Sequence, residues 1–158
     1  MMSSLQINLL KHRDKLQISH KDKKKYIFDP IRKKHLVLTP EELVRQLIIL
    51  FLNEERGFPL NKIRSEMGLK VNGMQKRCDL LVFDPQLNPL FLVECKAPKV
   101  KLTESTFEQI AQYNMTLKVP YLLVSNGPDN YCCKINHTDK EFIFLLNIPN
   151  YTSLIEKK

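Results

Sequence analysis

Short apolar runs along the chain alternate with two longer stretches in which apolar residues recur at helical spacing. The short runs are bounded by Asp-Pro, Asn or Gly, a pattern that predicts buried strands. The predicted strands are Tyr26–Phe28, His35–Leu38, Cys78–Phe83, Leu90–Val93, Tyr121–Val124, Tyr131–Ile135 and Phe142–Leu146. The short spacer between Phe83 and Leu90 predicts an antiparallel hairpin.

The two longer stretches predict amphipathic helices. Thr39 followed by Pro40 and two acidic residues is typical of a helix start, and the apolar stripe continues to about Glu55. A second helix is expected over Thr103–Met115, whereas Asn61–Met67 fits a helix or a strand. The order of helix, strands, helix, strands predicts an α/β fold with a mixed sheet.

Composition narrows the class of protein. The chain has 158 residues, of which 43% are apolar and 27% charged, as expected for one globular domain. No stretch approaches the ~20 apolar residues of a membrane helix, and no secretory leader is evident, so we expect a cytoplasmic protein. The 4 cysteines lack Cys-x-x-Cys spacing, which favours buried reduced thiols over a zinc site.

The net charge of +8 is concentrated near the N-terminus. Residues 1–35 hold 10 Lys/Arg and 3 Asp/Glu, a net +7. We predict a basic, flexible N-terminal segment over residues 1–25 and a single domain over 26–158. The segment fits an arm that contacts phosphates, and equally a solvated leader.

Three charged residues lie on or directly after strands that should be buried: Asp79, Glu94 and Lys96. Burying such groups is costly unless they are paired or bind a metal. The period of two along a strand puts Glu94 and Lys96 on one face and Cys95 on the other. Two carboxylates with a main-chain carbonyl suit Mg²⁺, beside which a Lys could orient water. An ion pair at a strand end is the alternative interpretation.

Motifs in a fixed order carry a family resemblance. They are Thr39–Gln46, Lys76–Asp79, Val93–Pro98, Gln109–Asn114 and Ser125–Gly127. This set, over roughly residues 26 to 148, resembles the PD-(D/E)XK nucleases, and among them the N-terminal nuclease domain of type I restriction enzyme R subunits in stand-alone form. Cys78 stands where the superfamily name has Pro. The resemblance implies a restriction-endonuclease-like core, with a central mixed β-sheet flanked by α-helices.

The resemblance also implies roles for individual residues. Mg²⁺, or Mn²⁺ as a substitute, would be held by Asp79, Glu94, Glu42 and the carbonyl of Cys95, with Glu41 as the competing helix carboxylate. Lys96 would position the water. Gln109 (or, less favoured, Gln112) and Tyr113 would orient the site, and Lys76, Arg77 and Arg45 would lie near phosphates.

The implied function is a Mg²⁺-dependent deoxyribonuclease acting in restriction, defence or repair. The alternatives are a nucleic-acid-binding module that does not cut and a subunit of a larger restriction complex. The chain has no G-x-x-x-x-G-K-[ST] motif, so we expect no ATP-driven motor in it. DNA would then be delivered by other restriction subunits or by a separate motor protein. Otherwise the chain would bind DNA itself, through the basic arm or as a homodimer.

Overall fold

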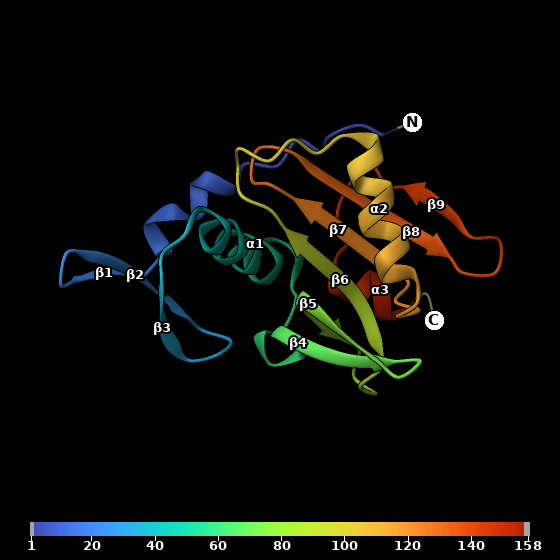
Figure 1. Ribbon diagram of the computed structural model, residues 1–158, viewed down its shortest axis with the longest axis horizontal. Helices are drawn as coiled ribbons and strands as arrows, with labels where there is room; N and C mark the ends of the chain where they lie inside the picture. The colour runs from blue at the N-terminus through green and yellow to red at the C-terminus, as the bar shows by residue number, and fades with distance from the viewer. Residues whose placement is uncertain (1, 157–158) are drawn as a thin grey trace.

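The computed structural model describes residues 2–156 and folds them into two sheets with helices between and around them (Figure 1). Within these residues, β1–β3 form a three-stranded "small sheet" and β4–β9 a six-stranded "larger sheet". The strands are β1 (Ile18–Lys21), β2 (Lys24–Asp29), β3 (Lys34–Val37), β4 (Ile63–Val71), β5 (Met74–Phe83), β6 (Pro89–Cys95), β7 (Tyr121–Ser125), β8 (Asn130–Asn136) and β9 (Glu141–Phe144). The helices are α1 (Pro40–Arg56), α2 (Glu104–Met115) and α3 (Tyr151–Glu156), with 3₁₀ turns η1 (Leu9–Lys15) and η2 (Leu60–Lys62).

The larger sheet is mixed, as predicted. Its strands lie side by side in chain order, and β6 and β7 run parallel while the other neighbours run antiparallel. The parallel pair is joined through α2, because such a pair requires a crossover connection. The predicted hairpin is confirmed as β5–β6, in which Leu80 lies opposite Val93.

The start and end of α1 follow from its capping residues. The Thr39 hydroxyl accepts a hydrogen bond from the Glu42 main-chain N–H at 3.0 Å, which satisfies a free donor of the first turn. Gly57 ends the helix in the left-handed conformation, with φ of 68°. Both features confirm the helix predicted from sequence.

Each face of the larger sheet is covered by a separate apolar core. One core joins α1 and α3 to the sheet through residues such as Ile48, Val93 and Leu154. The other joins α2 to the opposite face through Phe107 and Ala111. Figure 1 shows α2 crossing one face of the sheet, and α1 lying between the small and the larger sheets. The ends of β5 and β6 therefore lie where α1 and α2 approach the sheet from different sides.

Several elements differ from the predictions, among them strand β1, which was not predicted. The ambiguous stretch Asn61–Met67 is divided: its first two residues end the 3₁₀ turn η2, and the rest begins strand β4, which pairs with β5 from Ile63 onward. β5 begins earlier than predicted, since Asn72 and Gly73 both have positive φ (50° and 78°) and form a hairpin turn of the kind that continues a ladder. Helix α3 follows the last predicted strand and was not anticipated.

The basic N-terminal segment is packed against the domain. Leu5 and Leu9 are buried with residues of α1, and the Leu5 N–H donates to the Asn130 carbonyl at 2.8 Å. His12 is 3% exposed and lies between Glu54 (3.2 Å) and Glu55 (2.6 Å) of α1. These residues are therefore packed, where a flexible segment was predicted. The predicted division of the chain at residue 25 stays a prediction.

Among residues 2–156, no helix combines the length and the apolar character needed to cross a membrane.

Candidate active site

The register of β5 and β6 brings two carboxylates together. Leu80 lies opposite Val93, so the next position along the ladder sets Asp79 across from Glu94. The main-chain N–H of Cys95 donates to Asp79 Oδ2 at 2.7 Å, which fixes this carboxylate in the middle of β5, next to the last residues of β6. Asp79 and Glu94 therefore form a cross-strand pair at the edge of the core.

Burial and repulsion act on the Glu94 carboxyl. Loss of solvent is the largest effect, and the negative charge and hydrogen bonding of Asp79 add to it, so the pKa of Glu94 rises to about 8. Lys96 and Asn114, whose amide lies 3.4 Å from Glu94 Oε1, offset part of this rise. Without a further cation, Glu94 is thus protonated over much of the neutral range.

Lys96 lies on the same side of β6 as Glu94. Both residues line a hollow of about 260 Å³ beneath α2, together with Gln109 and Tyr113. Cys95, between them in sequence, is buried in the core on the opposite face. This arrangement agrees with the predicted alternation, and the hollow is open to solvent.

The structure separates the two acidic residues that the helical pattern left open. Glu42 is turned toward Arg32 (3.2 Å) and Gln46 (3.0 Å) and belongs to the contact between α1 and the small sheet. The pKa of Glu41 is raised, first by burial and then by the charge of Asp79, and Lys96 partly offsets the rise. The electrostatic coupling to Asp79 therefore favours Glu41, the competing choice, over Glu42 as the helix carboxylate of the site, and the role of either residue stays a prediction.

Arg45 is a buried cation among these carboxylates. It is 4% exposed, and its guanidinium lies 2.7 Å from Glu66 and 3.7 Å from Asp79. Its Nε atom is buried without a hydrogen-bond partner among the described residues, at 3.7 Å from Glu42. The prediction that Arg45 lies near phosphates is corrected by this burial, because a guanidinium enclosed by carboxylates does not face solvent.

The other predicted cations lie at the rim of the hollow. Lys76 Nζ lies 4.1 Å from the centre of the Tyr113 ring and donates to the Tyr113 carbonyl at 2.8 Å. Arg77 is largely exposed and lines the hollow beside Gln109. Gln112 is exposed on α2 and is not part of the hollow's lining. The roles of these residues stay predictions.

Two residues of the site were missed at the level of sequence. Glu66 binds Arg45 and holds a left-handed backbone (φ 55°) inside β4, opposite Asp79. Such a conformation is unusual for a non-glycine residue and interrupts the β4–β5 ladder at this point. Asn114 is 1% exposed, contacts Glu94 and leaves its Oδ1 atom buried without a partner among the described residues. The position of Asn114 beside the Gln109–Tyr113 motif was its one sequence signal.

The oxygen atoms of Asp79 and Glu94 are the candidate ligands for a hard divalent cation. Within residues 2–156, no group of three or more His, Cys, Asp and Glu side chains is arranged to hold a metal ion. Asp79 and Glu94 nevertheless supply two carboxylates, and Mg²⁺ in proteins is commonly bound by one or two carboxylates, with water and phosphate oxygens completing its shell. The pKa of Glu94 is raised first by burial and then by the negative charge of Asp79, and a cation bound between the two carboxylates would offset the second effect. The pair therefore offers two of the oxygen ligands that Mg²⁺ would need.

Comparison with known proteins agrees with this architecture. The model of the family "Type I restriction enzyme R protein N terminus (HSDR_N)" matches residues 40–149. A solved fragment from Vibrio vulnificus YJ016, described as an HsdR subunit of a type I restriction enzyme, is similar in fold, with a TM-score of 0.54 and 21% identity. The similarity covers 76% of this chain and 25% of that one. No curated protein matches the chain.

Proposed function

Because the chain belongs to the family of type I restriction enzyme R protein N-termini, we propose that it is a Mg²⁺-dependent nuclease that hydrolyses DNA phosphodiester bonds in restriction, defence or repair. The observation that carries the proposal is the cross-strand pair of Asp79 and Glu94, of which Glu94 lines a solvent-open hollow together with Lys96. Carboxylates that share a confined site, next to a cation, are the groups that metal-assisted phosphodiester hydrolysis requires.

In this proposal Asp79, Glu94 and the Cys95 carbonyl hold the metal, and Glu41 takes the place predicted for Glu42. When bound, Mg²⁺ would stabilise the charge that develops on the phosphate and activate a water molecule. Asp79 is fitted to its role because the Cys95 N–H already orients one carboxylate oxygen. Arg45 holds the other oxygen from the buried side and so positions Asp79 without contacting substrate.

Lys96 and the residues of α2 face the substrate side of the hollow. The Lys96 ammonium can donate hydrogen bonds to a water or to a phosphate oxygen next to Glu94. Gln109 and Tyr113 line the same hollow and can contact the sugar-phosphate chain, while Lys76 and Arg77 add positive charge at its rim. The chain's own residues therefore orient the scissile group and the attacking water.

How DNA reaches the site is a further part of the proposal. The chain spans a quarter of the length of the Vibrio vulnificus chain to which it is similar in fold. We propose that this chain acts with other restriction-complex subunits or with a motor protein, and that two copies together cut both strands of a duplex.

One observation favours a second candidate, a nucleic-acid-binding module that does not cut. Arg45 already neutralises part of the acidic cluster from within, and a resident guanidinium can stabilise such a cluster without metal. In that case the fold and the rim cations would bind nucleic acid, and divalent cations would change neither binding nor stability.

The test is nicking of supercoiled plasmid with Mg²⁺ or Mn²⁺. We expect the wild type to nick, and Asp79→Ala and Lys96→Ala to lower the rate by about 100- to 1,000-fold, the usual effect of removing a group that stabilises charge in the transition state. The matched controls are Lys134→Ala, at an exposed position on β8, and Glu141→Ala, at an exposed position on β9. Both should nick at the wild-type rate. Equal nicking by all variants, or none by the wild type, would refute the proposed activity of this chain.

A further inference from the structure

The small sheet presents one open face. The pairings of Ser19 with Tyr26, Tyr26 with Val37, and Phe28 with His35 place these side chains on the same face, because directly paired residues project to one side. Lys21 and Lys24 are paired at its tip. We call this set the outer face: Ser19, Lys21, Lys24, Tyr26, Phe28, His35 and Val37. The alternate residues of β2, Ile27 and Asp29, are buried on the other side.

Rings and cations are interleaved on the outer face. Lys21, Lys24 and His35 are exposed, whereas Tyr26 is half-buried. A solvent-open hollow of about 540 Å³ is lined by Ser19, His20, Lys21, Asp22, Tyr26 and His35. In this hollow the rings of Tyr26 and His35 offer surfaces on which nucleic-acid bases can stack. Lys21 adds a positive charge that can bind a phosphate.

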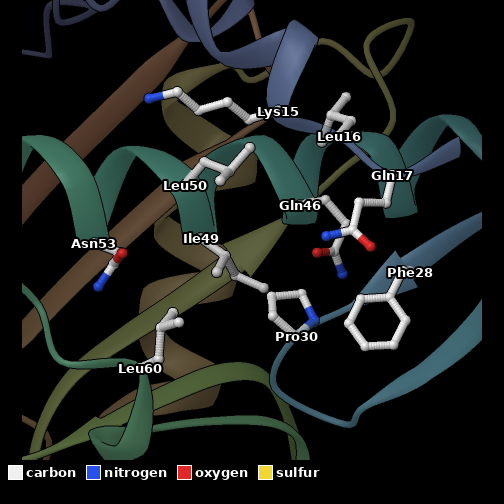
Figure 2. Close-up of a pocket in the computed structure, with 10 residues that line it drawn as sticks. All are labelled: Lys15, Leu16, Gln17, Phe28, Pro30, Gln46, Ile49, Leu50, Asn53 and Leu60. Atoms are coloured by element: carbon white, nitrogen blue, oxygen red, sulfur yellow. The ribbon is translucent and has the colours of Figure 1, made fainter.

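Two rings pack together at one end of the outer face. The rings of Phe28 and His35 meet edge to face, with centroids 5.2 Å apart. Figure 2 shows Phe28 beside Pro30 and Gln46, at the pocket between α1 and the small sheet. Phe28 and α1 line the same pocket, so α1 borders the outer face at this end, while its tip at Lys21 and Lys24 stays exposed.

Charge favours an anionic occupant. Residues 18–37 contain seven Lys/Arg and two Asp. Of these, Asp29 is fully buried and bound to Arg32 at 2.5 Å, so its charge is neutralised within the fold. The exposed surface of the small sheet is therefore positive, and Asp22 is the exposed carboxylate that remains among residues 18–37.

An ionic chain connects the small sheet to the candidate active site. Arg32, in the β2–β3 turn, binds Glu42 at 3.2 Å, and Glu42 lies 3.7 Å from Arg45. Arg45 in turn lies 3.7 Å from Asp79. The small sheet is thus held in a defined position relative to Asp79, although it precedes residues 40–149, the stretch that matches the family.

We propose that the outer face of the small sheet binds single-stranded nucleic acid. Lys21 and Lys24 contact phosphates, and Tyr26 and His35 stack on bases. The inference rests on the proposed function for its substrate class, and it adds a second contact that holds an unpaired strand next to the cleavage site. A single strand is favoured over a duplex because its bases are free to stack on an open sheet.

The test is fluorescence anisotropy of a labelled mixed-sequence single strand, and of the matching duplex, with the full chain in EDTA so that nothing is cut. We expect the single strand to bind more tightly. Lys21→Glu with Lys24→Glu should weaken binding and lower the salt slope by about 1.4, or about 0.7 for each lost phosphate contact. Tyr26→Ala should weaken it about 5- to 150-fold with the slope unchanged, and Tyr26→Phe should bind as the wild type does.

Lys134→Glu with Lys140→Glu is the matched control, because it reverses two exposed charges around the β8–β9 hairpin at the other end of the molecule (Figure 1). An equal loss in this control, an unaffected Tyr26→Ala, or tighter binding of the duplex would overturn the inference. So would binding to phosphatidylserine vesicles without binding to the oligonucleotide. If the small-sheet variants bind the single strand normally and the wild type nicks plasmid, only the single-strand inference is overturned. If those variants lose binding but the wild type does not nick plasmid, only the proposed nuclease activity is overturned.

Discussion

At the scale of single residues, the Glu94 carboxyl makes the stability of the metal-free protein depend on pH. Its pKa is raised to about 8 by burial and by Asp79, whereas a free Glu titrates near pH ~4.3. The folded state therefore keeps a proton that the unfolded chain loses. This contribution to stability is complete below the unfolded pKa and is lost as pH rises through the folded pKa.

We therefore expect the melting temperature of the wild type in EDTA to fall, relative to Glu94→Gln, as the pH rises from about 5 to about 8. The amide of Gln carries no charge at either pH, so the variant lacks this dependence. Thermal denaturation of both proteins across that range is the measurement. Parallel curves would show that Glu94 is ionised in the folded state throughout, contrary to the electrostatics described above.

Arg45 is expected to matter more for folding than an exposed arginine does. Arg45→Met leaves Glu66, Asp79 and Glu42 without their shared cation, and breaking a buried ion pair in this way usually costs about 3–5 kcal/mol. Arg64→Met is the matched control, because Arg64 is exposed and donates to main-chain carbonyls of β4 and η2. Urea denaturation should separate the two variants, and equal stability would argue against Arg45 as the organising charge.

The juxtaposition of Glu94 and Lys96 could be predicted, because alternation along a strand needs no knowledge of other elements. The choice between Glu41 and Glu42 could not, since both begin the same helix and the partner that decides it, Arg32, comes from the small sheet. Glu66 was also not predicted, because its ion pair with Arg45 joins two elements, β4 and α1, whose contact the sequence pattern does not record.

At the scale of elements, those with local signals were predicted best. Helix α1 has a cap, a stripe and a terminal glycine, and the β5–β6 hairpin has a short polar spacer. Strand β1 has neither, since its four residues are all exposed and show no alternation. It forms because β2 supplies its hydrogen-bond partners, a tertiary effect that hydrophobic periodicity does not record.

The N-terminal segment provides a test at this scale. Leu9 in η1 is 3% exposed and packs with α1, whereas its neighbour Leu10 is 60% exposed. We expect Leu9→Ala to lower the free energy of unfolding by about 2–5 kcal/mol, as for other buried leucines, and Leu10→Ala to change it little. Chemical denaturation measures both. If Leu9→Ala and Leu10→Ala changed the free energy of unfolding equally, the segment would behave as a flexible arm and not as a packed part of the fold.

At the scale of the whole molecule, the charge and the chemistry lie in different places. The carboxylates of the candidate site come from α1, from the middle of β5 and from the last residues of β6, while the excess positive charge lies mainly in residues 1–35. The fold holds these two regions together through Arg32, Glu42 and Arg45. In the proposed function, nucleic acid would bind the small sheet and reach the candidate site with a phosphate.

The central claim is that Asp79 and Glu94 together bind a divalent cation, and calorimetric titration with Mn²⁺ tests it most directly. We predict one ion bound per chain by the wild type and by Glu141→Ala, with protons released below about pH 8 because Glu94 must ionise. Asp79→Ala should lose this binding while staying folded. Absence of binding by the wild type, or unchanged binding by Asp79→Ala, would contradict the account.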